Sequence, residues 1–157
     1  MKVIYPRTNE ELEGKSIFLA GTIDNGNSEN WQEEIINLYK NDEVTFFNPR
    51  RKYWNPLMNS ELKDELEYQI KWEQEHLDKA DLIIMCLLDN SKSPISLLEL
   101  GLYAQSKKII VFCNDLFYRY QNVKLTCDKY GIPLKKFNKS KIKIEIDKFL
   151  GKIKGMN

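Results

Sequence analysis

The chain has 157 residues, 42% of them hydrophobic and 11% aromatic, so it is long enough to bury one good core and we expect one domain over residues 1–157. Its 24 Lys and Arg residues nearly balance its 23 Asp and Glu residues, which gives no electrostatic case for a polymeric nucleic acid or a membrane as partner. Residues 1–16 are too polar for a signal peptide, no apolar run approaches the ~20 residues that span a bilayer, and the three cysteines show neither a disulfide framework nor a zinc spacing, so we expect a cytoplasmic protein.

The first third of the chain predicts a strand, a polar loop and a helix. Residues 3–5 are either an extra edge strand or an arm, and residues 16–21 form a buried strand. Asn30 with Glu33 three residues later predicts a helix start and a helix over 31–39. The loop 22–30 between them is either an ordinary solvated connection or, as is usual at the carboxyl end of the first strand of an α/β sheet, part of a ligand crevice. Its glycine spacing does not match a dinucleotide fingerprint.

The second unit contains the first candidate carboxylate. Residues 44–47 predict a strand that ends at Asn48, and Arg50 and Arg51 after it either hold a phosphate or form a basic surface loop. A long helix begins at residue 59 or 60 and runs to about 79, with an apolar stripe made of Leu62, Leu66, Ile70 and Leu77. Glu73 falls in that stripe, so we expect it to point inward; the alternative is that it reaches water or pairs with a nearby lysine. His76, the single histidine, is expected to be partly exposed, and its isolation argues against a metal site.

The second candidate carboxylate lies on a helix between two apolar strands. Residues 81–88 and 108–113 predict strands buried on both faces of a parallel sheet. Between them, Glu99 has apolar neighbours nearly all round a helix that starts with Ser93 as N-cap and Pro94, so the pattern predicts a buried helix and a buried carboxylate. A buried Glu either pairs structurally or serves a function. Gly101 costs helix stability and favours a closely approaching ligand or backbone.

Strand and helix alternate along the chain, which predicts an open, doubly wound α/β sheet. Towards the end of the chain the pattern is weaker. Residues 117–120 form a helix or loop that covers the site, residues 124–127 together with 132–134 give a last short strand, and residues 140–154 form a closing helix. Two inward carboxylates on helices that flank one strand are the arrangement that retaining glycosyl transfer uses, with the carboxyl groups ~5 Å apart.

Five runs of the sequence, in order, resemble the nucleoside 2-deoxyribosyltransferase-like family over roughly residues 1–115. They are residues 18–24 (FLAGTID), 48–50 (NPR), 69–73 (QIKWE), 80–81 (AD) and 93–101 (SPISLLELG). The resemblance implies a flavodoxin-like, mostly parallel sheet with helices on both faces, and neither a metal nor an organic cofactor. It also implies a nucleoside or nucleotide and a free nucleobase as small-molecule partners, and a homo-oligomer, a dimer or higher, in which a neighbouring subunit helps to close each site.

The resemblance also assigns roles to individual residues. Glu99 matches the nucleophile that attacks C1′ of the deoxyribose, and Glu73 stands where the family has an Asp that protonates or orients the base. Ser93 occupies a position that is Asp in the transferases, and that Asp binds the 5′ hydroxyl. In the related deoxynucleoside 5′-monophosphate N-hydrolases the same position is Ser, which contacts the phosphate. The predicted substrate-binding residues are Gly21, Thr22, Asp24, Asn48, Arg50, Trp72, Ser93 and Ser96. Phe18, Trp54 and Trp72 are either stacking surfaces for the base or part of the core.

Three functions remain open at this point. The first is transfer of deoxyribose from a 2′-deoxynucleoside or deoxynucleotide to another base through an ester on Glu99. The second is hydrolysis of a deoxynucleoside 5′-monophosphate, which Ser93 favours. The third is a nucleotide-binding or sensor protein without turnover, because Ile95, Leu97 and Leu98 stand where the family usually has glycines that let the sugar approach.

Overall fold

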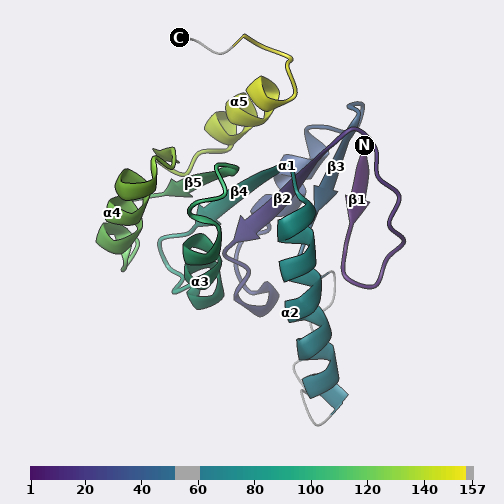
Figure 1. The fold of residues 1–157 in the computed structure, drawn as a ribbon, viewed down its shortest axis with the longest axis horizontal. Helices are drawn as coiled ribbons and strands as arrows, with labels where there is room; N and C mark the ends of the chain where they lie inside the picture. The colour runs from purple at the N-terminus through teal and green to yellow at the C-terminus, as the bar shows by residue number, and fades with distance from the viewer. Residues whose placement is uncertain (52–60, 155–157) are drawn as a thin grey trace.

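Six parallel strands form one sheet in a computed structural model of the chain, which describes residues 1–51 and 61–154, residues 61 and 62 by their backbone only. The strand order is β1-β3-β2-β4-β5-β6 (Figure 1). This is an α/β fold of the flavodoxin type with one additional edge strand, as the sequence predicts. The strands are β1 (Lys2–Ile4), β2 (Lys15–Gly21), β3 (Val44–Phe47), β4 (Leu82–Leu87), β5 (Ile109–Cys113) and β6 (Leu134–Lys135).

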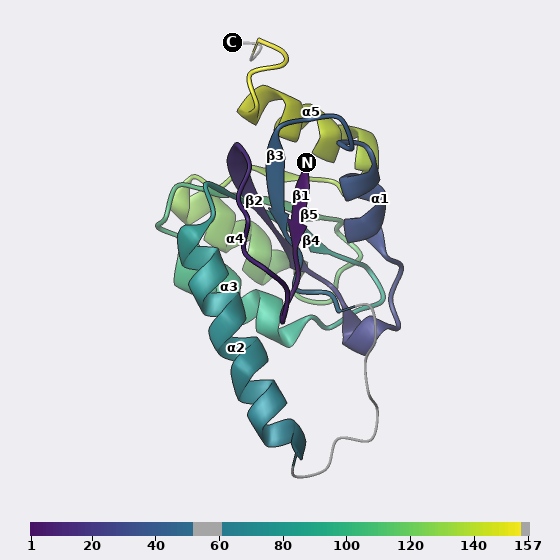
Figure 2. The same ribbon diagram turned by 90° about the vertical axis from the view of Figure 1, so that its right-hand side faces the viewer.

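Helices cover both faces of the sheet. One face carries α2 (Glu61–Lys79), α3 (Pro94–Tyr103) and α4 (Tyr120–Tyr130), and the other carries α1 (Trp31–Asn37) and α5 (Lys139–Phe149) (Figures 1 and 2). A short 3-10 turn, η1 (Asp24–Gly26), lies in the loop after β2. No helix in the described ranges is long and apolar enough to cross a membrane.

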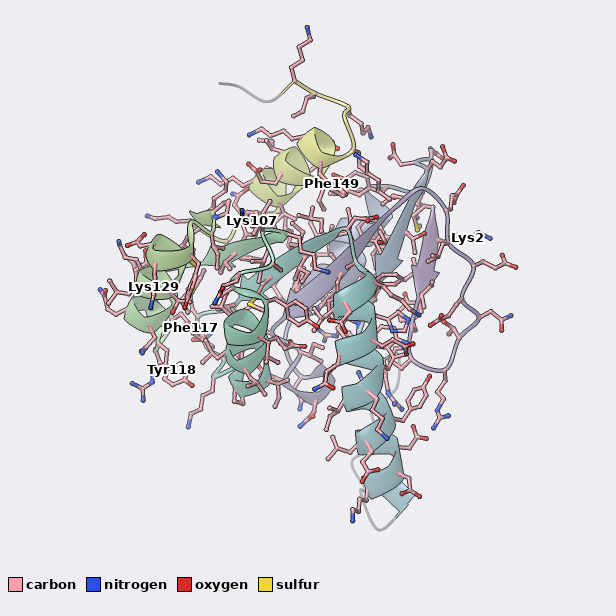
Figure 3. All side chains as sticks on the ribbon, in the orientation of Figure 1. Lys2, Lys107, Phe117, Tyr118, Lys129 and Phe149 are labelled. Carbon is pink, nitrogen blue, oxygen red and sulfur yellow. The ribbon has the colours of Figure 1, made fainter. Side chains whose placement is uncertain are left out.

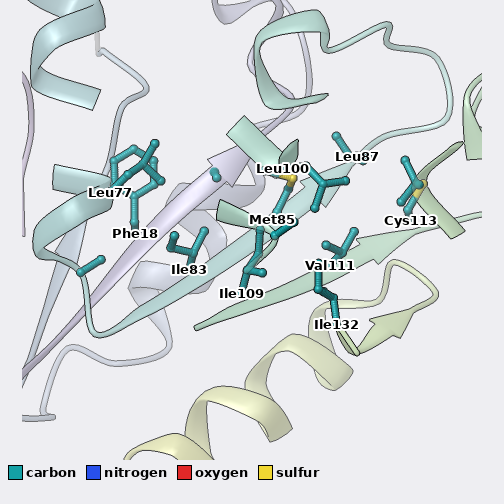
Figure 4. Packing of buried hydrophobic residues seen from close by; sticks show 14 of the residues in the cluster. Phe18, Leu77, Ile83, Met85, Leu87, Leu100, Ile109, Val111, Cys113 and Ile132 are labelled. Atoms are coloured by element: carbon teal, nitrogen blue, oxygen red, sulfur yellow. The ribbon is translucent and has the colours of Figure 1, made fainter. Parts of the chain in front are cut away.

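The core consists of two clusters, one on each side of the sheet. The cluster under α2, α3 and α4 includes Phe18, Leu77, Met85, Leu100 and Val111 (Figure 4). Strands β2, β3 and β4 contribute side chains to both clusters, which explains their nearly continuous apolar sequences. The cysteines Cys86, Cys113 and Cys127 are free and buried, in agreement with the prediction that they form no disulfide framework.

The described element boundaries agree with the sequence prediction to within two residues except near the end of the chain, and the predicted start of the long helix at residue 59 or 60 lies outside the described residues. Residues 2–4 pair with β3 as an edge strand, and Asn30 caps α1 by accepting a hydrogen bond from the Glu33 N–H at 3.2 Å. The strand predicted over residues 124–127 is wrong, because these residues belong to α4, where Val123 and Cys127 face the core one helical turn apart. The closing helix ends at Phe149, and β6 is Leu134–Lys135, so Leu134 alone of the predicted last strand lies in a strand.

The site predicted from the sequence lies where the chain leaves the central strands in opposite directions. After β2 the chain passes to α1 on one face, and after β4 it passes to α3 on the other, so the loops diverge at the carboxyl ends of two neighbouring strands. Gly21 ends β2 with a φ of +123°, and a Cβ added there would lie 2.0 Å from the Cys86 carbonyl oxygen. Only glycine therefore permits the close approach of β2 and β4 at this point.

Candidate functional site

A chain of hydroxyl groups joins the two loops that diverge after β2 and β4. The Oγ atoms of Thr22 and Ser93 lie 2.7 Å apart, and those of Ser93 and Ser91 lie 2.8 Å apart. Ser91 in turn donates to Oδ1 of Asp24 at 2.7 Å. At the other end, the Leu88 N–H donates to Oγ1 of Thr22 at 2.9 Å. Three predicted binding residues, Thr22, Asp24 and Ser93, are thus brought together, with Ser91 as the link between two of them.

Ser93 is the N-cap residue of α3, but its side chain does not cap the helix. Its backbone is left-handed, with φ 44° and ψ 52°, and its hydroxyl group faces Thr22 and Ser91 instead of the helix N–H groups. The expectation that Ser93 is a side-chain cap is therefore wrong. Pro94 has no N–H, and the N–H groups of Ile95 and Ser96 have no acceptor within the helix.

Glu73 lies on the side of α2 that faces the core, as predicted. Its Oε1 accepts a hydrogen bond of 3.0 Å from Nε2 of Gln69, one turn earlier on the helix. Burial raises the pKa of Glu73 above the usual value of a glutamate, while the hydrogen bond from Gln69 and the positive charge of Arg51 oppose that rise. Arg51 is itself held by Gln69 at 2.7 Å and by Glu65 at 3.0 Å.

The pKa of Glu99 is raised more strongly than that of Glu73. Burial, and after it the negative charge of nearby Glu73, raise the pKa of Glu99 to about 8. No described residue donates a hydrogen bond to the Glu99 carboxylate, whereas Glu73 has Gln69. At neutral pH Glu99 therefore keeps its proton.

The prediction that α3 is buried all round is wrong. Leu100 is buried, but Ile95 and Leu98 are each 58% exposed and Leu102 is 60% exposed. Glu99 is half-buried at the border between these two sides, one helical turn after Ile95. The apolar sequence thus contains both a core face and an uncovered face, which composition alone does not separate.

The apolar stripe of α2 is also covered over only part of its length. Leu77 is buried, whereas Leu66 and Ile70 are 52% and 42% exposed, so the prediction holds only for the part after Glu73. The Leu62 side chain lies outside the described residues. In Figure 1, α2 runs well past the end of the sheet, and the described contacts of its first half are polar or cation–π contacts of Arg7 and Arg51 with Glu65 and Tyr68. Uncovered apolar side chains therefore lie next to both carboxylates.

Two aromatic predictions and one histidine prediction have definite outcomes. Trp72 is 5% exposed and its ring lies 6.1 Å from that of Phe18, so both rings belong to the core. His76 is buried, contrary to expectation, because its ring stacks on Trp72 at 4.1 Å and its Nε2 lies 2.5 Å from Oε1 of Glu10. Trp54, the third candidate for stacking on a base, lies outside the described residues.

Arg50 holds the loop after β2 in place. Its guanidinium group donates to the carbonyl oxygens of Gly26, Ser28 and Glu29 at 3.1, 2.6 and 2.8 Å. Asn48 accepts a hydrogen bond of 3.0 Å from the Arg50 N–H. Both residues line a cavity of about 340 Å³, but the Arg50 donors are directed at the protein backbone and not at that space. Their role as substrate-binding residues stays a prediction.

The remaining predicted positions lie close to this arrangement or away from it. Ser96 is buried on the core side of α3, one turn before Leu100. Residues 117–120 do not cover the carboxylates, because Phe117 is buried in the core and Tyr118 lines a groove of about 300 Å³ on the α4 side of α3 (Figure 3). A further cavity of about 460 Å³ lies at the ends of β2, β4 and β5 and is lined by Asp24, Asp89 and Asn114, among others.

Sequence reasoning missed three residues that shape the site. Ser91 lies two residues before Ser93 in the loop after β4, and Gln69 lies one turn before Glu73, so their spacing could have shown that they reach the same neighbours. Arg51 is predicted either to hold a phosphate or to belong to a basic surface loop, and no pattern in the sequence links it to Glu73. Within residues 1–51 and 61–154, no three His, Cys, Asp or Glu side chains are grouped so that they could hold a metal ion.

The comparisons with known proteins agree with the resemblance. The family model described as nucleoside 2-deoxyribosyltransferase like matches residues 14–117, which is more than half of the chain. A search of curated proteins found no match. The matched segment runs from β2 to the end of β5 and contains both carboxylates and the hydroxyl chain. The chain belongs to the nucleoside 2-deoxyribosyltransferase-like family.

Proposed function

We propose that the protein cleaves the N-glycosidic bond of a 2′-deoxynucleoside and transfers the deoxyribose to another nucleobase. The observation that carries this proposal is the pair of inward carboxylates on α2 and α3, in which the charge of Glu73 helps to raise the pKa of Glu99 to about 8. Family membership supports glycosyl transfer or hydrolysis as the class of reaction.

In the proposed reaction, an ionised Oε of Glu99 attacks C1′ of the sugar. A C1′–O ester bond forms as the C1′–N bond breaks, and the leaving base takes a proton from Glu73. A nitrogen of the incoming base then attacks C1′, the ester bond breaks, and the proton that this nitrogen loses returns to Glu73. Two displacements at C1′ restore the original configuration, and no oxidant, reductant or metal takes part.

The proton on the carboxylate pair sets a requirement on this sequence of steps. Gln69 and Arg51 favour the ionised form of Glu73 against the larger effect of its burial, and Glu99 keeps its proton at neutral pH. The first step needs an ionised Glu99 and a protonated Glu73, so the binding of substrate must take the proton from Glu99 and leave a proton on Glu73. A nucleobase that accepts a hydrogen bond from Glu73 would favour this shift, because it stabilises the protonated acid. If the shift does not occur, the two residues exchange roles and Glu73 becomes the nucleophile.

The alternative of a binding protein without turnover is less well supported than the sequence suggested. It relied on the bulk of Ile95, Leu97 and Leu98 before Glu99. Ile95 and Leu98 point outward, whereas Leu97 lines the groove towards α4 and packs against the core, so only Leu97 adds bulk on the buried side of α3. Hydrolysis of a deoxynucleoside 5′-monophosphate shares the same two carboxylates and stays the second candidate.

We also propose that the protein is a homo-oligomer whose neighbouring subunit covers the carboxylates. Its support is the uncovered apolar surface made of Leu66, Ile70, Ile95, Leu98 and Leu102. Contiguous exposed apolar surface of this kind is typical of interaction sites. Because the surface adjoins Glu73 and Glu99, a second copy seated on it would exclude water from the reacting bond.

The proposal is tested by incubating the protein with a 2′-deoxynucleoside and a different free nucleobase and separating the products by chromatography. We expect the exchanged nucleoside, and its loss in Glu99→Gln and Glu73→Gln. Glu67→Gln, which removes an exposed carboxylate from the same helix as Glu73, is the matched control and should keep full activity. Free deoxyribose or its phosphate without exchange would favour the hydrolase, and exchange that survives in Glu99→Gln would refute the covalent mechanism.

The nucleophile is identified by mass spectrometry after reaction with a 2′-fluoro deoxynucleoside. The electron-withdrawing fluorine slows the breakdown of the glycosyl ester, so the modified peptide can be isolated. We expect the added mass on Glu99. The same mass on Glu73 would show that the proton stays on Glu99 and that the two roles are exchanged.

A further inference from the structure

Gln69 is held in one orientation by three hydrogen-bond partners. The residue is 7% exposed, and its amide group has two protons and one oxygen that need partners. Nε2 donates to the carbonyl oxygen of Pro49 at 3.1 Å and to Oε1 of Glu73 at 3.0 Å, while Oε1 accepts from Nε of Arg51 at 2.7 Å. A guanidinium group only donates and a backbone carbonyl group only accepts, so the amide group cannot turn over without losing these bonds. Towards Glu73, Gln69 is therefore a fixed donor.

The segment that follows β3 supplies two of these partners. Pro49 and Arg51 are two residues apart, and Arg50 between them donates to three carbonyl groups of the loop after β2. Arg51 also donates to Oε2 of Glu65 on α2 at 3.0 Å. The segment is thus anchored to the loop on one side and to α2 on the other, which fixes the Arg51 side chain where it meets Gln69.

The orientation of Gln69 acts on the proton of Glu73. A donor directed at a buried carboxyl group stabilises its ionised form, and the positive charge of Arg51 acts in the same direction. Burial has the larger and opposite effect, so the pKa of Glu73 is raised, but less than burial alone would raise it. Without Arg51 the amide group of Gln69 would be free to turn and present its oxygen, which favours the protonated acid instead.

We propose that Arg51 and Gln69 are positioning residues that hold Glu73 as the proton acceptor of the second step, in which the incoming nucleobase loses a proton. This inference rests on the proposed function. In the first step Glu73 gives its proton to the leaving base, and Gln69 then stabilises the carboxylate through Oε1. In the second step a nitrogen of the incoming base forms the new bond to C1′, the electron pair of the ester bond returns to Glu99, and the proton of that nitrogen moves to Oε2 of Glu73.

Rapid mixing with a 2′-deoxynucleoside and a second nucleobase separates the two steps. In Gln69→Met the side chain keeps its length and loses the donor. We expect the first burst of released base not to slow, and the exchange with the second base to slow ~10-fold or more, as the loss of a hydrogen bond to a charged group requires.

The pH dependence distinguishes this role from a merely structural one. A higher pH should restore exchange in Gln69→Met, because a carboxylate that has lost its donor ionises at a higher pH. Lys71→Met, which removes an exposed positive charge from the same helix, is the control and should change neither step. A burst and an exchange that slow equally, with an unchanged pH profile, would overturn the inference.

The ionisation of Glu73 is measured without turnover by NMR of protein labelled with carbon-13 at the glutamate carboxyl groups. The signal that is missing in Glu73→Gln identifies the residue. We expect the pKa of Glu73 to rise in Gln69→Met and in Arg51→Met. The rise caused by Arg51→Met should be less than half as large when Gln69 is already replaced, because Arg51 then has no amide group to orient.

The titration separates this inference from the proposed reaction. Equal rises in the two backgrounds would show that Arg51 acts by its charge alone, and would overturn the inference even where exchange is observed. If the wild type exchanges no base, the proposed function fails, and the titration still decides whether Arg51 and Gln69 control the proton of Glu73. The backbone amide spectrum shows whether each variant is folded, and Gln69→Leu is used where Gln69→Met does not fold.

Discussion

Replacing Glu99 by Gln should make the folded protein more stable, and the gain should grow with pH. The folded state keeps a proton on Glu99 until about pH 8, because its pKa is raised to about 8, whereas an unfolded chain loses that proton near pH 4.5. Between these two values the unfolded state binds fewer protons, so the free energy of unfolding of the wild type falls as pH rises. Gln is neutral and close in shape, so Glu99→Gln keeps the burial and removes the titration.

The size of the effect follows from the same pKa. Each pH unit across the interval lowers the free energy of unfolding by ~1.4 kcal/mol, so at pH 8 and above the wild type loses about 5 kcal/mol relative to pH 4.5. We expect Glu99→Gln to match the wild type near pH 5 and to be more stable by several kcal/mol at pH 8 to 9. Such a gain is a large part of the ~5–15 kcal/mol that stabilises a typical domain.

Urea denaturation at pH 5, 6, 7, 8 and 9, at one fixed protein concentration, measures this difference. The concentration is held fixed because association of subunits adds to the apparent stability. Glu67→Gln, which changes an exposed carboxylate on α2, is the control for the loss of one negative charge. A stability difference between Glu99→Gln and the wild type that is the same at pH 5 and pH 9 would refute the reasoning, as would a loss of stability at pH 9.

Two further predictions concern the sheet and the uncovered surface. Gly21→Ala should lower the free energy of unfolding by at least about 3 kcal/mol, because a Cβ at φ +123° meets the Cys86 carbonyl oxygen. Gly101→Ala places its Cβ in open space and should raise the free energy of unfolding by up to ~1 kcal/mol. Equal effects of the two substitutions in urea denaturation would contradict the geometry. Leu98→Asp should convert an oligomer into a monomer in sedimentation velocity while the circular dichroism spectrum stays unchanged, and a wild type that is monomeric at high concentration would contradict the proposed interface.

The parts of the fold that the sequence predicts well are those in which local pattern and burial coincide. β4 and β5 are buried on both faces of the sheet, so nearly every residue in them is apolar. A continuous apolar run of this length between polar residues predicts a buried strand directly. Asn30 and Glu33 form their cap within four residues, and Gly21 ends a strand against its neighbour. In each of these cases the pattern is complete within a few residues, even where the partner, such as Cys86 for Gly21, lies far along the chain.

The parts that the sequence does not predict depend on residues far apart in the chain. His76 is buried because Glu10, 66 residues earlier, reaches its ring, and no local pattern contains that contact. The donors of Arg50 are taken up by carbonyl groups more than 20 residues before it. Leu98 faces water and Leu100 faces the core, although both are apolar. The sequence of the helix does not separate these two faces, since a core face and an interaction face are both apolar.

Features that cost stability are concentrated at the candidate site, and this concentration supports a functional role for the site. Five described residues other than glycine have a positive φ, and three of them, Asp24, Asn25 and Ser93, lie in the two loops at the carboxyl ends of β2 and β4. Next to these loops is a carboxylate, Glu99, that keeps its proton far above the usual pH. A chain selected for stability alone would relieve each of these costs with one substitution. Their coincidence at the point where an α/β sheet binds its ligands is explained if the backbone strain fixes the hydroxyl chain and the Glu99 carboxyl group performs the chemistry.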